Sequence, residues 1–288
     1  MSILEVMDLS YSYSGGLPSP TAAISNINLK IEQGEIIGII GHTGSGKSTL
    51  VQHLNGLLTP TSGKVLFEGK DIWEKGTKIK KIREKVGLVF QYPEYQLFEE
   101  TAKEDIAFGP KNMGVTGDEL TERVISAARA VGLKDELLDA SPFDLSGGEK
   151  RRVAIAGVLA MNPEVLIFDE PTAGLDPIGR ENILKIVKDC RDKNGATVIM
   201  VSHSMDDIAL IADRILVMNK GSVFMFDTVH NVFSNAEKLM EIGLNIPNIT
   251  KVFVELKNQG INLPDSVYTM DDAVKAILSY ANGRGNNA

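Results

Sequence analysis

Cysteine is almost absent from this chain of 288 residues, in which Cys190 is the only one. A single cysteine excludes an intramolecular disulfide and a cage of cysteines around a metal, and it fits a reduced cytoplasmic setting. Long apolar runs are also lacking, because no stretch approaches the ~20 residues that a membrane-spanning helix needs. The N-terminal residues, with acids at Glu5 and Asp8, do not have the pattern of a signal peptide. We therefore expect any membrane role to go through a partner protein.

An excess of positive charge is missing as well. The chain has 30 Lys and Arg against 38 Asp and Glu, a formal net charge of −8. This balance argues against a nucleic-acid-binding surface as the main role, so we expect no nucleic-acid partner. Apolar residues make up 43% of the chain, as in soluble globular proteins. The length suffices for one large domain or two.

A glycine-rich loop stands out from this background. It matches the P-loop pattern and lies between an apolar, strand-like run at Glu35–Ile40 and a helical pattern at Thr49–Leu54. Its glycines allow a tight turn, and its N–H groups point at a ligand from a helix start that favours negative charge. A glycine-rich turn that binds nothing is the alternative, which the complete motif and its context disfavour. The expected nucleotide-binding residues here are Gly41, His42, Thr43, Gly44, Ser45, Gly46, Lys47, Ser48 and Thr49.

Two side chains of the loop have specific expected tasks. Lys47 brings a point charge to the β- and γ-phosphates of the nucleotide, and Ser48 supplies a hydroxyl ligand for Mg²⁺. ATP and Mg²⁺ are therefore the expected substrate and cofactor.

Strands and helices alternate along the rest of the chain, which favours an α/β fold with a parallel sheet. Predicted strands cover 3–13, 24–31, 64–68, 86–90, 164–168, 196–201 and 215–218. A helical insert at about 91–160 separates the P-loop from the strand at 164–168. After about residue 226 the pattern changes, and predicted helices at 248–257 and from Thr269 onward form a small helical appendage. We expect one nucleotide-binding domain over 1–235 and the appendage over 236–288.

Two carboxylates close the apolar run Val165–Phe168. A fully apolar strand belongs inside a parallel sheet, and ligands bind at the carboxyl ends of such strands. Asp169 is expected to hold Mg²⁺, and Glu170 is placed to orient or deprotonate water. Acids at a strand end are common, but beside a P-loop they indicate a Walker B motif.

A second anion-binding helix start follows Leu145 in the sequence Ser146-Gly147-Gly148-Glu149-Lys150-Arg151-Arg152. This stretch resembles the signature motif of the ATP-binding cassette (ABC) ATPases, about a hundred residues after the P-loop and just before Walker B. The resemblance implies that Ser146, Gly147 and Gly148 close over the nucleotide held by another subunit. Two separate phosphate-binding segments in one chain thus predict a head-to-tail dimer in which each nucleotide site is shared by both subunits.

Other positions match the same family in order over roughly residues 1–235. Gln91 resembles the Q-loop glutamine that senses Mg²⁺ and the attacking water, and His203 resembles the switch histidine at the γ-phosphate. Asp176 lies in a stretch similar to the D-loop, which crosses the dimer interface. Tyr13 resembles the aromatic residue that stacks on the base, although sheet packing is the commoner role for such a residue; Tyr11 is the second choice. The side chains of His42, His53 and His230 have no such support and are expected to be structural.

The resemblance also implies the fold and the branch of the family. The expected fold is an α/β ABC-type P-loop NTPase with a RecA-like parallel core, an N-terminal antiparallel β subdomain, an α-helical signature subdomain and the helical appendage. The segments Gln91–Phe98 and Glu104–Pro110 look like those of energy-coupling factor (ECF) transporters. The loop Ser14–Pro20 is similar to that of the second of the two paralogous ECF ATPases.

Membership of that branch would make the chain a Mg²⁺-dependent, transport-coupled ATPase of a vitamin or metal-ion importer. Its expected partners are a second ATPase subunit (a paralogue or a second copy), a membrane coupling subunit and a substrate-capturing membrane subunit. It would lie peripherally on the cytoplasmic face of the cell membrane. Another class of ABC transporter is the alternative. A soluble ribosome or DNA-repair protein and a non-enzymatic scaffold fit less well, because neither paired cassettes nor a long coiled coil occurs and Glu170 and His203 are intact.

A cluster of acids surrounds the Q-loop, and it has two interpretations. It is either a solvated face or a surface that receives basic side chains of the membrane subunit, where exposed pairs would steer docking while aromatic burial anchors it. The acids are Glu94, Glu99, Glu100, Glu104 and Asp105.

Overall fold

The computed structural model describes residues 1–13, 21–261, 263–264 and 266–285. Its centre is a six-stranded sheet in which every neighbouring pair is parallel except the edge pair β10–β9. The expected parallel core is therefore confirmed. The spatial order is β10 (Ser222–Thr228), β9 (Arg214–Asn219), β3 (Ile36–Gly41), β8 (Thr197–Val201), β7 (Val165–Asp169) and β6 (Val86–Val89).

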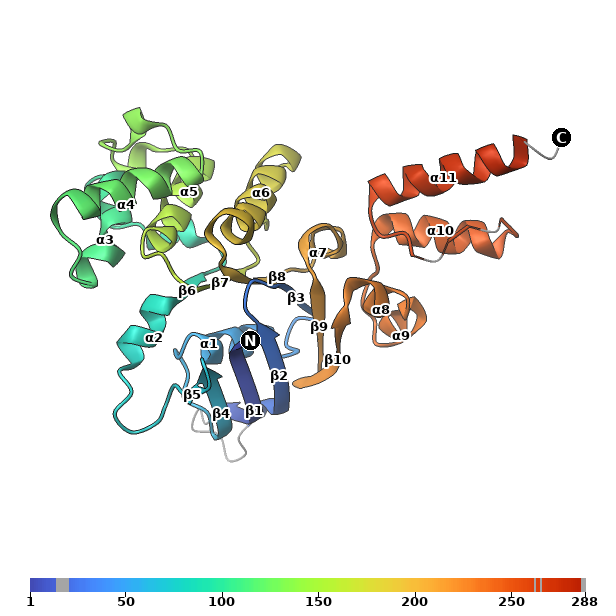
Figure 1. Ribbon diagram of the computed structural model, residues 1–288, viewed down its shortest axis with the longest axis horizontal. Coiled ribbons are helices and arrows are strands. Elements are labelled where there is room, and N and C mark those ends of the chain that lie inside the picture. The colour runs from blue at the N-terminus through green and yellow to red at the C-terminus, as the bar shows by residue number, and fades with distance from the viewer. Residues whose placement is uncertain (14–20, 262, 265, 286–288) are drawn as a thin grey trace.

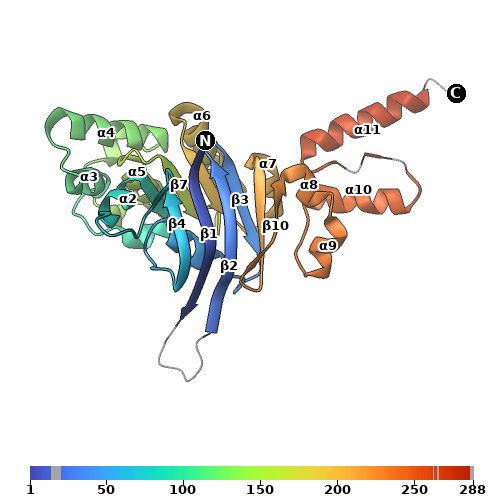
Figure 2. The ribbon, with the colours of Figure 1, turned by 60° about the horizontal axis from the view of Figure 1, so that its bottom comes forward.

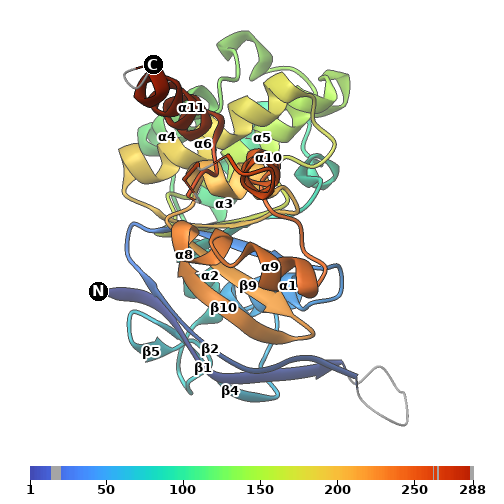
Figure 3. The same cartoon turned by 90° about the vertical axis from the view of Figure 1, so that its right-hand side faces the viewer.

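The central strands are apolar throughout because both faces of the sheet are covered. Along β7, Val165 and Ile167 pack into one hydrophobic core, whereas Leu166 and Phe168 pack into another. This alternation follows from the two-residue period of a strand. The sheet is thus the middle of three layers, as Figure 3 shows.

An antiparallel sheet forms the layer on the first face, as the resemblance predicted. Its strands pack with helix α1 (Lys47–Leu54) against the six-stranded sheet. The loop 14–20, which was compared with that of the second ECF ATPase, lies outside the described residues. The strand order is β2 (Thr21–Glu32), β1 (Ser2–Tyr13), β4 (Ser62–Phe67) and β5 (Lys70–Asp71).

Helices cover the second face, and three of them form a separate lobe beside β6 and β7 (Figures 1 and 2). This lobe corresponds to the expected signature subdomain, with α3 (Ala102–Asn112), α4 (Gly117–Ala130) and α5 (Gly147–Leu159). Nearer the centre lie α6 (Pro177–Asn194) and α7 (Met205–Ile211), and α2 (Ile79–Lys85) leads into β6. Helix α6 begins at Pro177, because the Asp176 side chain caps it and proline is well suited to the first turn of a helix.

The C-terminal part contains elements that the sequence did not indicate: β10, α8 (Val229–Phe233) and α9 (Ala236–Glu241). Helices α8 and α9 pack into the same core as the helices of the second face, whereas α10 (Asn248–Asn258) and α11 (Met270–Gly285) enclose a small core around Phe253. The division at residue 235 remains a prediction. Across the described ranges, no helix combines the length and the apolar character needed to cross a bilayer.

Candidate nucleotide site

Four groups of the predicted site residues meet at one edge of the six-stranded sheet, whereas Ser146, Gly147 and Gly148 lie apart from them at the start of α5. The carboxyl ends of β3, β8, β7 and β6 lie side by side there, and they lead into the P-loop, His203, Glu170 and Gln91 in that order. The parallel register sets Asp169 level with Val201, and Val201 level with Ile39. Residues far apart in sequence therefore converge because parallel strands all end at the same edge.

Glycine is required at two positions of the P-loop for steric reasons. Gly46 has a φ of 98°, and an added Cβ would lie 2.6 Å from the Ile24 side chain. An added Cβ on Gly41, where φ is 153°, would collide with the carbonyl oxygen of Met218. The loop can therefore turn tightly under the antiparallel sheet and keep its outer face free, where Thr43, Gly44 and Ser48 are exposed.

Lys47 is buried at the start of α1, and its Nζ donates to the carbonyl oxygens of Gly41 (2.7 Å) and His42 (3.0 Å). Burial lowers the pKa of Lys47, and the nearby carboxylates of Glu170 and Asp169 act in the opposite direction. The carbonyl oxygens of the P-loop thus hold the Lys47 amine in place, beside the loop N–H groups with which it would bind phosphate.

Asp169 lies near the Ser48 side chain. Burial raises the pKa of Asp169 and so does the charge of Glu170, while the charge of Lys47 and the nearby Ser48 hydroxyl oppose the rise. A carboxylate and a hydroxyl side by side are hard oxygen donors of the kind that Mg²⁺ prefers, so these two residues fit that ion. Gln91 is exposed, two residues beyond the end of β6, the strand that pairs with β7.

Glu170 and His203 are brought into contact, with Glu170 Oε1 2.6 Å from His203 Nε2. Glu170 has a φ of 51°, a left-handed conformation that is uncommon for this residue type. Its backbone N–H donates to the carbonyl oxygen of Val201 at 3.0 Å, which holds the turn against β8. A strained residue of this kind at a strand end is typical of functional sites.

Tyr13 and Tyr11 have different surroundings. Tyr13 is 47% exposed, and its hydroxyl lies 3.2 Å from Thr49 Oγ1 in the P-loop helix. Tyr11 is half-buried and packs edge-on against both Tyr13 and His53. The structure therefore leaves the Tyr13 ring, and not that of Tyr11, available beside the P-loop.

If Tyr13 stacks on the adenine base, Tyr13→Ala should raise the dissociation constant for ATP by about fivefold to tenfold, the effect of losing roughly 1 kcal/mol of ring contact. Equilibrium titration with a fluorescent ATP analogue measures this change. Tyr13→Phe keeps the ring and should bind as the parent does. Equal affinity of the alanine variant and the parent would exclude Tyr13 as the base platform.

The signature helix begins in the open. Ser146 caps α5 and forms a capping box with Glu149, whose carboxylate accepts from the Ser146 hydroxyl at 2.6 Å and from its N–H at 2.9 Å. An added Cβ on Gly147 or Gly148 would meet no atom within 4 Å. The exposed helix start thus presents the N–H groups of Gly147 and Gly148 away from the chain's own packing, as a surface for an anion from outside would.

Arg151 is the main residue of the site region that the sequence analysis missed. It is 4% exposed, donates to both carboxylate oxygens of Glu94 (3.0 and 2.9 Å), and also donates to the carbonyl oxygens of Pro171 and Ala173. One side chain thereby joins the signature helix, the segment after Gln91 and the loop after Walker B. Apart from the position of Arg151 in the stretch that resembles the signature motif, nothing in the sequence indicated this buried role.

This pairing corrects part of the interpretation of the acidic cluster. Burial alone would raise the pKa of Glu94, but the bonds from Arg151 bring it below its usual value, so Glu94 is an internal ion-pair partner. Asp105 is buried, and its carboxylate accepts from the N–H groups of Phe98 (3.2 Å) and Glu99 (3.3 Å). Neither acid belongs to a free docking face.

A second buried carboxylate was also missed. Asp207, 1% exposed in α7, accepts from the hydroxyl of Thr172 at 2.8 Å and pairs with Arg180 of α6. Its N–H donates to Ser204, the residue after His203. Asp207 therefore connects the loop after β7 to the loop that carries His203.

The other histidines are structural in different ways. His53 is fully buried, burial lowers its pKa, and its Nδ1 donates to the carbonyl oxygen of Thr49 at 2.7 Å. His230 lies 3.1 Å from the Tyr268 hydroxyl. The ring of His42 faces the C-terminal part, with Nε2 2.7 Å from the carbonyl oxygen of Ile242.

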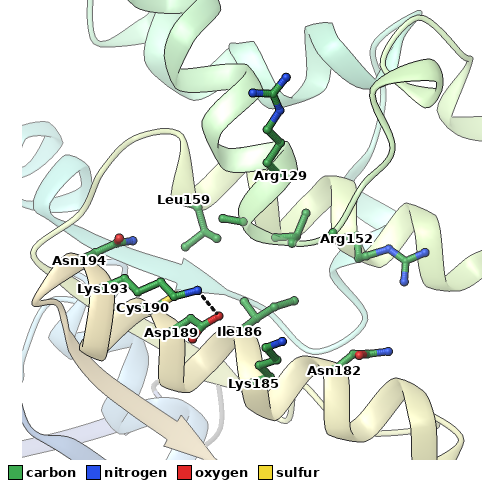
Figure 4. Close-up of a pocket in the computed structure, with 13 residues that line it drawn as sticks. Arg129, Arg152, Leu159, Asn182, Lys185, Ile186, Asp189, Cys190, Lys193 and Asn194 are labelled. Carbon is green, nitrogen blue, oxygen red and sulfur yellow. Dashed lines mark hydrogen bonds and ion pairs between the residues drawn. The ribbon is translucent and has the colours of Figure 1, made fainter.

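A separate cavity of about 370 Å³ lies between α4, α5 and α6, and no P-loop or Walker B residue lines it (Figure 4). Two of its basic side chains are paired with acids, Arg129 with Asp135 and Lys193 with Asp189, each at 3.0 Å. Cys190 lies at its wall, where burial raises the thiol pKa to about 12. The thiol therefore stays protonated at neutral pH and is a poor nucleophile.

Known proteins resemble this chain closely. Residues 24–173 match the family described as "ABC transporter". The "energy-coupling factor transporter ATP-binding protein EcfA2" of Caldanaerobacter subterraneus subsp. tengcongensis is 53% identical over 98% of this chain and 99% of that protein. The protein of the same name from Clostridium perfringens is 51% identical over 99% of both.

Solved structures agree in fold. CbiO1 from Clostridium perfringens, described as part of the ABC transporter complex cbiONQ, superposes with a TM-score of 0.75 at 41% identity, covering 88% of this chain and 98% of that one. The cassette MJ0796, described as dimeric and bound to ADP and Pi, gives a TM-score of 0.71 at 29% identity and covers 78% of this chain and 98% of that one.

The P-loop, the Walker B strand and the signature helix on this three-layer core define an ABC-type ATP-binding cassette, and the chain belongs to the ABC transporter family. Within the family it is an ATP-binding, ATP-hydrolysing subunit of an energy-coupling factor transporter of the EcfA2 kind.

Proposed function

We propose that this chain drives uptake of a vitamin or metal ion by closing, with a second cassette, around ATP and Mg²⁺. The P-loop of one cassette would hold the phosphates, and the Ser146–Gly148 helix start of the other would cover them. The observation that carries this proposal is that the chain has two helix starts of the kind that can bind phosphate, in separate lobes, and that the second faces open space. The dimer described for MJ0796 supports the pairing.

Within each site the residues have distinct tasks. The P-loop N–H groups and Lys47 would bind the β- and γ-phosphates. Ser48, Asp169 and Gln91 would hold Mg²⁺, which supplies charge neutralisation on the phosphate oxygens when bound. Glu170 would accept a proton from the attacking water. His203, whose Nε2 lies 2.6 Å from Glu170 Oε1, would contact the γ-phosphate and fix the orientation of the Glu170 carboxylate.

The energy of closure would reach the membrane through the segment after Gln91. This segment exposes large aromatic rings, among them those of Tyr95 (85% exposed) and Phe98 (59%). Exposed apolar groups gathered in this way commonly mark an interaction surface. Glu99, which is half-buried, and Glu100, which is exposed, lie beside them. Among the described residues, neither carboxylate has an ion-pair partner like that of Glu94. An apolar anchor with an acidic rim fits basic, amphipathic helices of a membrane coupling subunit at the cytoplasmic face.

Tyr95→Ala should lower the affinity for the membrane subunits at least about tenfold, because an exposed ring near the centre of an interface is a common hot spot. The measurement is the amount of this chain that co-purifies with tagged membrane subunits. Phe224→Ala removes another exposed ring, on β10, and serves as the matched control. Undiminished recovery of the Tyr95 variant would contradict docking at this segment.

A further inference from the structure

The C-terminal unit, residues 236–285, touches the P-loop directly. The Nε2–H of His42 donates to the carbonyl oxygen of Ile242 at 2.7 Å. Ile242 follows the last residue of α9, so His42 satisfies a carbonyl that a helix end leaves unpaired. Gly243 comes next with a φ of 78°, and an added Cβ there would lie 3.1 Å from His42 Nε2. The chain therefore turns closely against the ring of this P-loop residue.

The same unit also touches the loop of the switch histidine. Asp206 lies three residues after His203, in the first turn of α7. Its Oδ1 accepts from the Asn248 N–H at 2.9 Å, and its Oδ2 accepts from Asn248 Nδ2 at 2.7 Å. Both oxygens of the carboxylate are thus engaged by the first residue of α10. The neighbouring Asp207 continues the link to the loop after Walker B.

Helices α10 and α11 are also joined to the rest of the chain by Tyr268, whose ring packs against Phe233 and whose hydroxyl lies 3.1 Å from both Ser234 Oγ and His230 Nδ1. They have a small hydrophobic core of their own, and a groove of about 960 Å³ separates their first turns from α6 and α7. Figures 1 and 2 show the two helices projecting away from the sheets. The Asn248–Asp206 bonds lie at the near end of this projection, so a shift of the switch-histidine loop would be carried into α10.

We propose that His42 and Asn248 position the P-loop and the switch-histidine loop from the C-terminal unit, so that nucleotide binding and the placement of α10 and α11 are coupled. The inference rests on the ATP site proposed above and adds its control by the C-terminal unit. Coupling of this kind is reciprocal: if nucleotide binding stabilises one placement of the C-terminal unit, that placement raises the affinity for nucleotide by the same factor. Removing the hydrogen bonds of either contact should weaken ATP binding by about fivefold to tenfold.

Two measurements on the full-length chain in its purified complex test the coupling. In equilibrium titrations with a fluorescent ATP analogue, Asn248→Ala and His42→Ala should both bind about fivefold to tenfold more weakly than the parent. His42→Gln keeps a donor of similar reach and should restore most of the affinity. Asn258→Ala, at the far end of α10, is the matched control and should bind as the parent does.

The second measurement is amide hydrogen exchange with and without ATP. ATP should slow exchange at residues 242–258 in the parent but not in Asn248→Ala, although P-loop amides become protected in both. Exchange at 242–258 that ignores ATP while the P-loop is protected would overturn the coupling, as would parental affinity of Asn248→Ala. A P-loop that ATP does not protect would instead refute the ATP site itself.

Discussion

Glu170→Gln is expected to lower the steady-state rate of ATP hydrolysis by at least about 100-fold, the usual contribution of a general base. The amide has the same shape as the carboxylate but cannot accept a proton from water. ATP should still bind, because Lys47 and the P-loop are untouched, and the ATP-bound assembly should accumulate because it no longer turns over. Phosphate release and retention of labelled ATP on the purified complex measure the two effects.

The matched control is Glu164→Gln, at the opposite end of the same strand. Glu164 is half-buried just before β7 and pairs with Lys85 at 2.8 Å, at the end of the strand away from the carboxyl edge of the sheet. Its replacement should leave hydrolysis unchanged. A Glu170→Gln variant that hydrolyses ATP at the parental rate would exclude Glu170 as the base.

Arg151→Met is expected to have the largest effect on folding stability, roughly 3–5 kcal/mol, the usual cost of removing one partner of a buried ion pair. The change leaves the Glu94 carboxylate and the carbonyl oxygens of Pro171 and Ala173 without their shared donor. Methionine preserves much of the volume, so the loss reports on charge and hydrogen bonding rather than on a cavity. Chemical denaturation of the full-length chain measures it.

Arg123→Met is the control for this change, because the pair of Arg123 with Glu119 lies at the surface of α4 and should contribute less than about 1 kcal/mol. The double variant Glu94→Gln with Arg151→Met should recover part of the lost stability, since it no longer buries an unpaired charge. Equal stability of Arg151→Met and Arg123→Met would contradict the role assigned to the buried pair.

Residues in short motifs could be predicted from the sequence because their chemistry depends on local spacing. The P-loop pattern fixed the positions of Lys47 and Ser48, and the apolar strand ending in acids fixed Asp169 and Glu170. In the structure these residues converge with His203, because parallel strands end at one edge of the sheet, as the register of β3, β8 and β7 shows.

Partners separated by many residues could not be predicted in this way. Glu94 and Arg151 are 57 positions apart, and nothing in the composition around Glu94 distinguishes a buried carboxylate from a solvated one. Asp207 looks like any acid in the first turn of a helix until its bond with Thr172 places it in the core. Strand β10 was also missed, because its half-exposed edge position gives a weak apolar pattern.

The most direct test of the shared site is the structure of the Glu170→Gln assembly closed on ATP and Mg²⁺. We predict that Ser146 of one protomer contacts the γ-phosphate of a nucleotide whose β- and γ-phosphates are bound by Lys47, or its counterpart, in the partner. A closed assembly in which Ser146 faces solvent, or contacts a nucleotide bound by its own chain, would contradict the account.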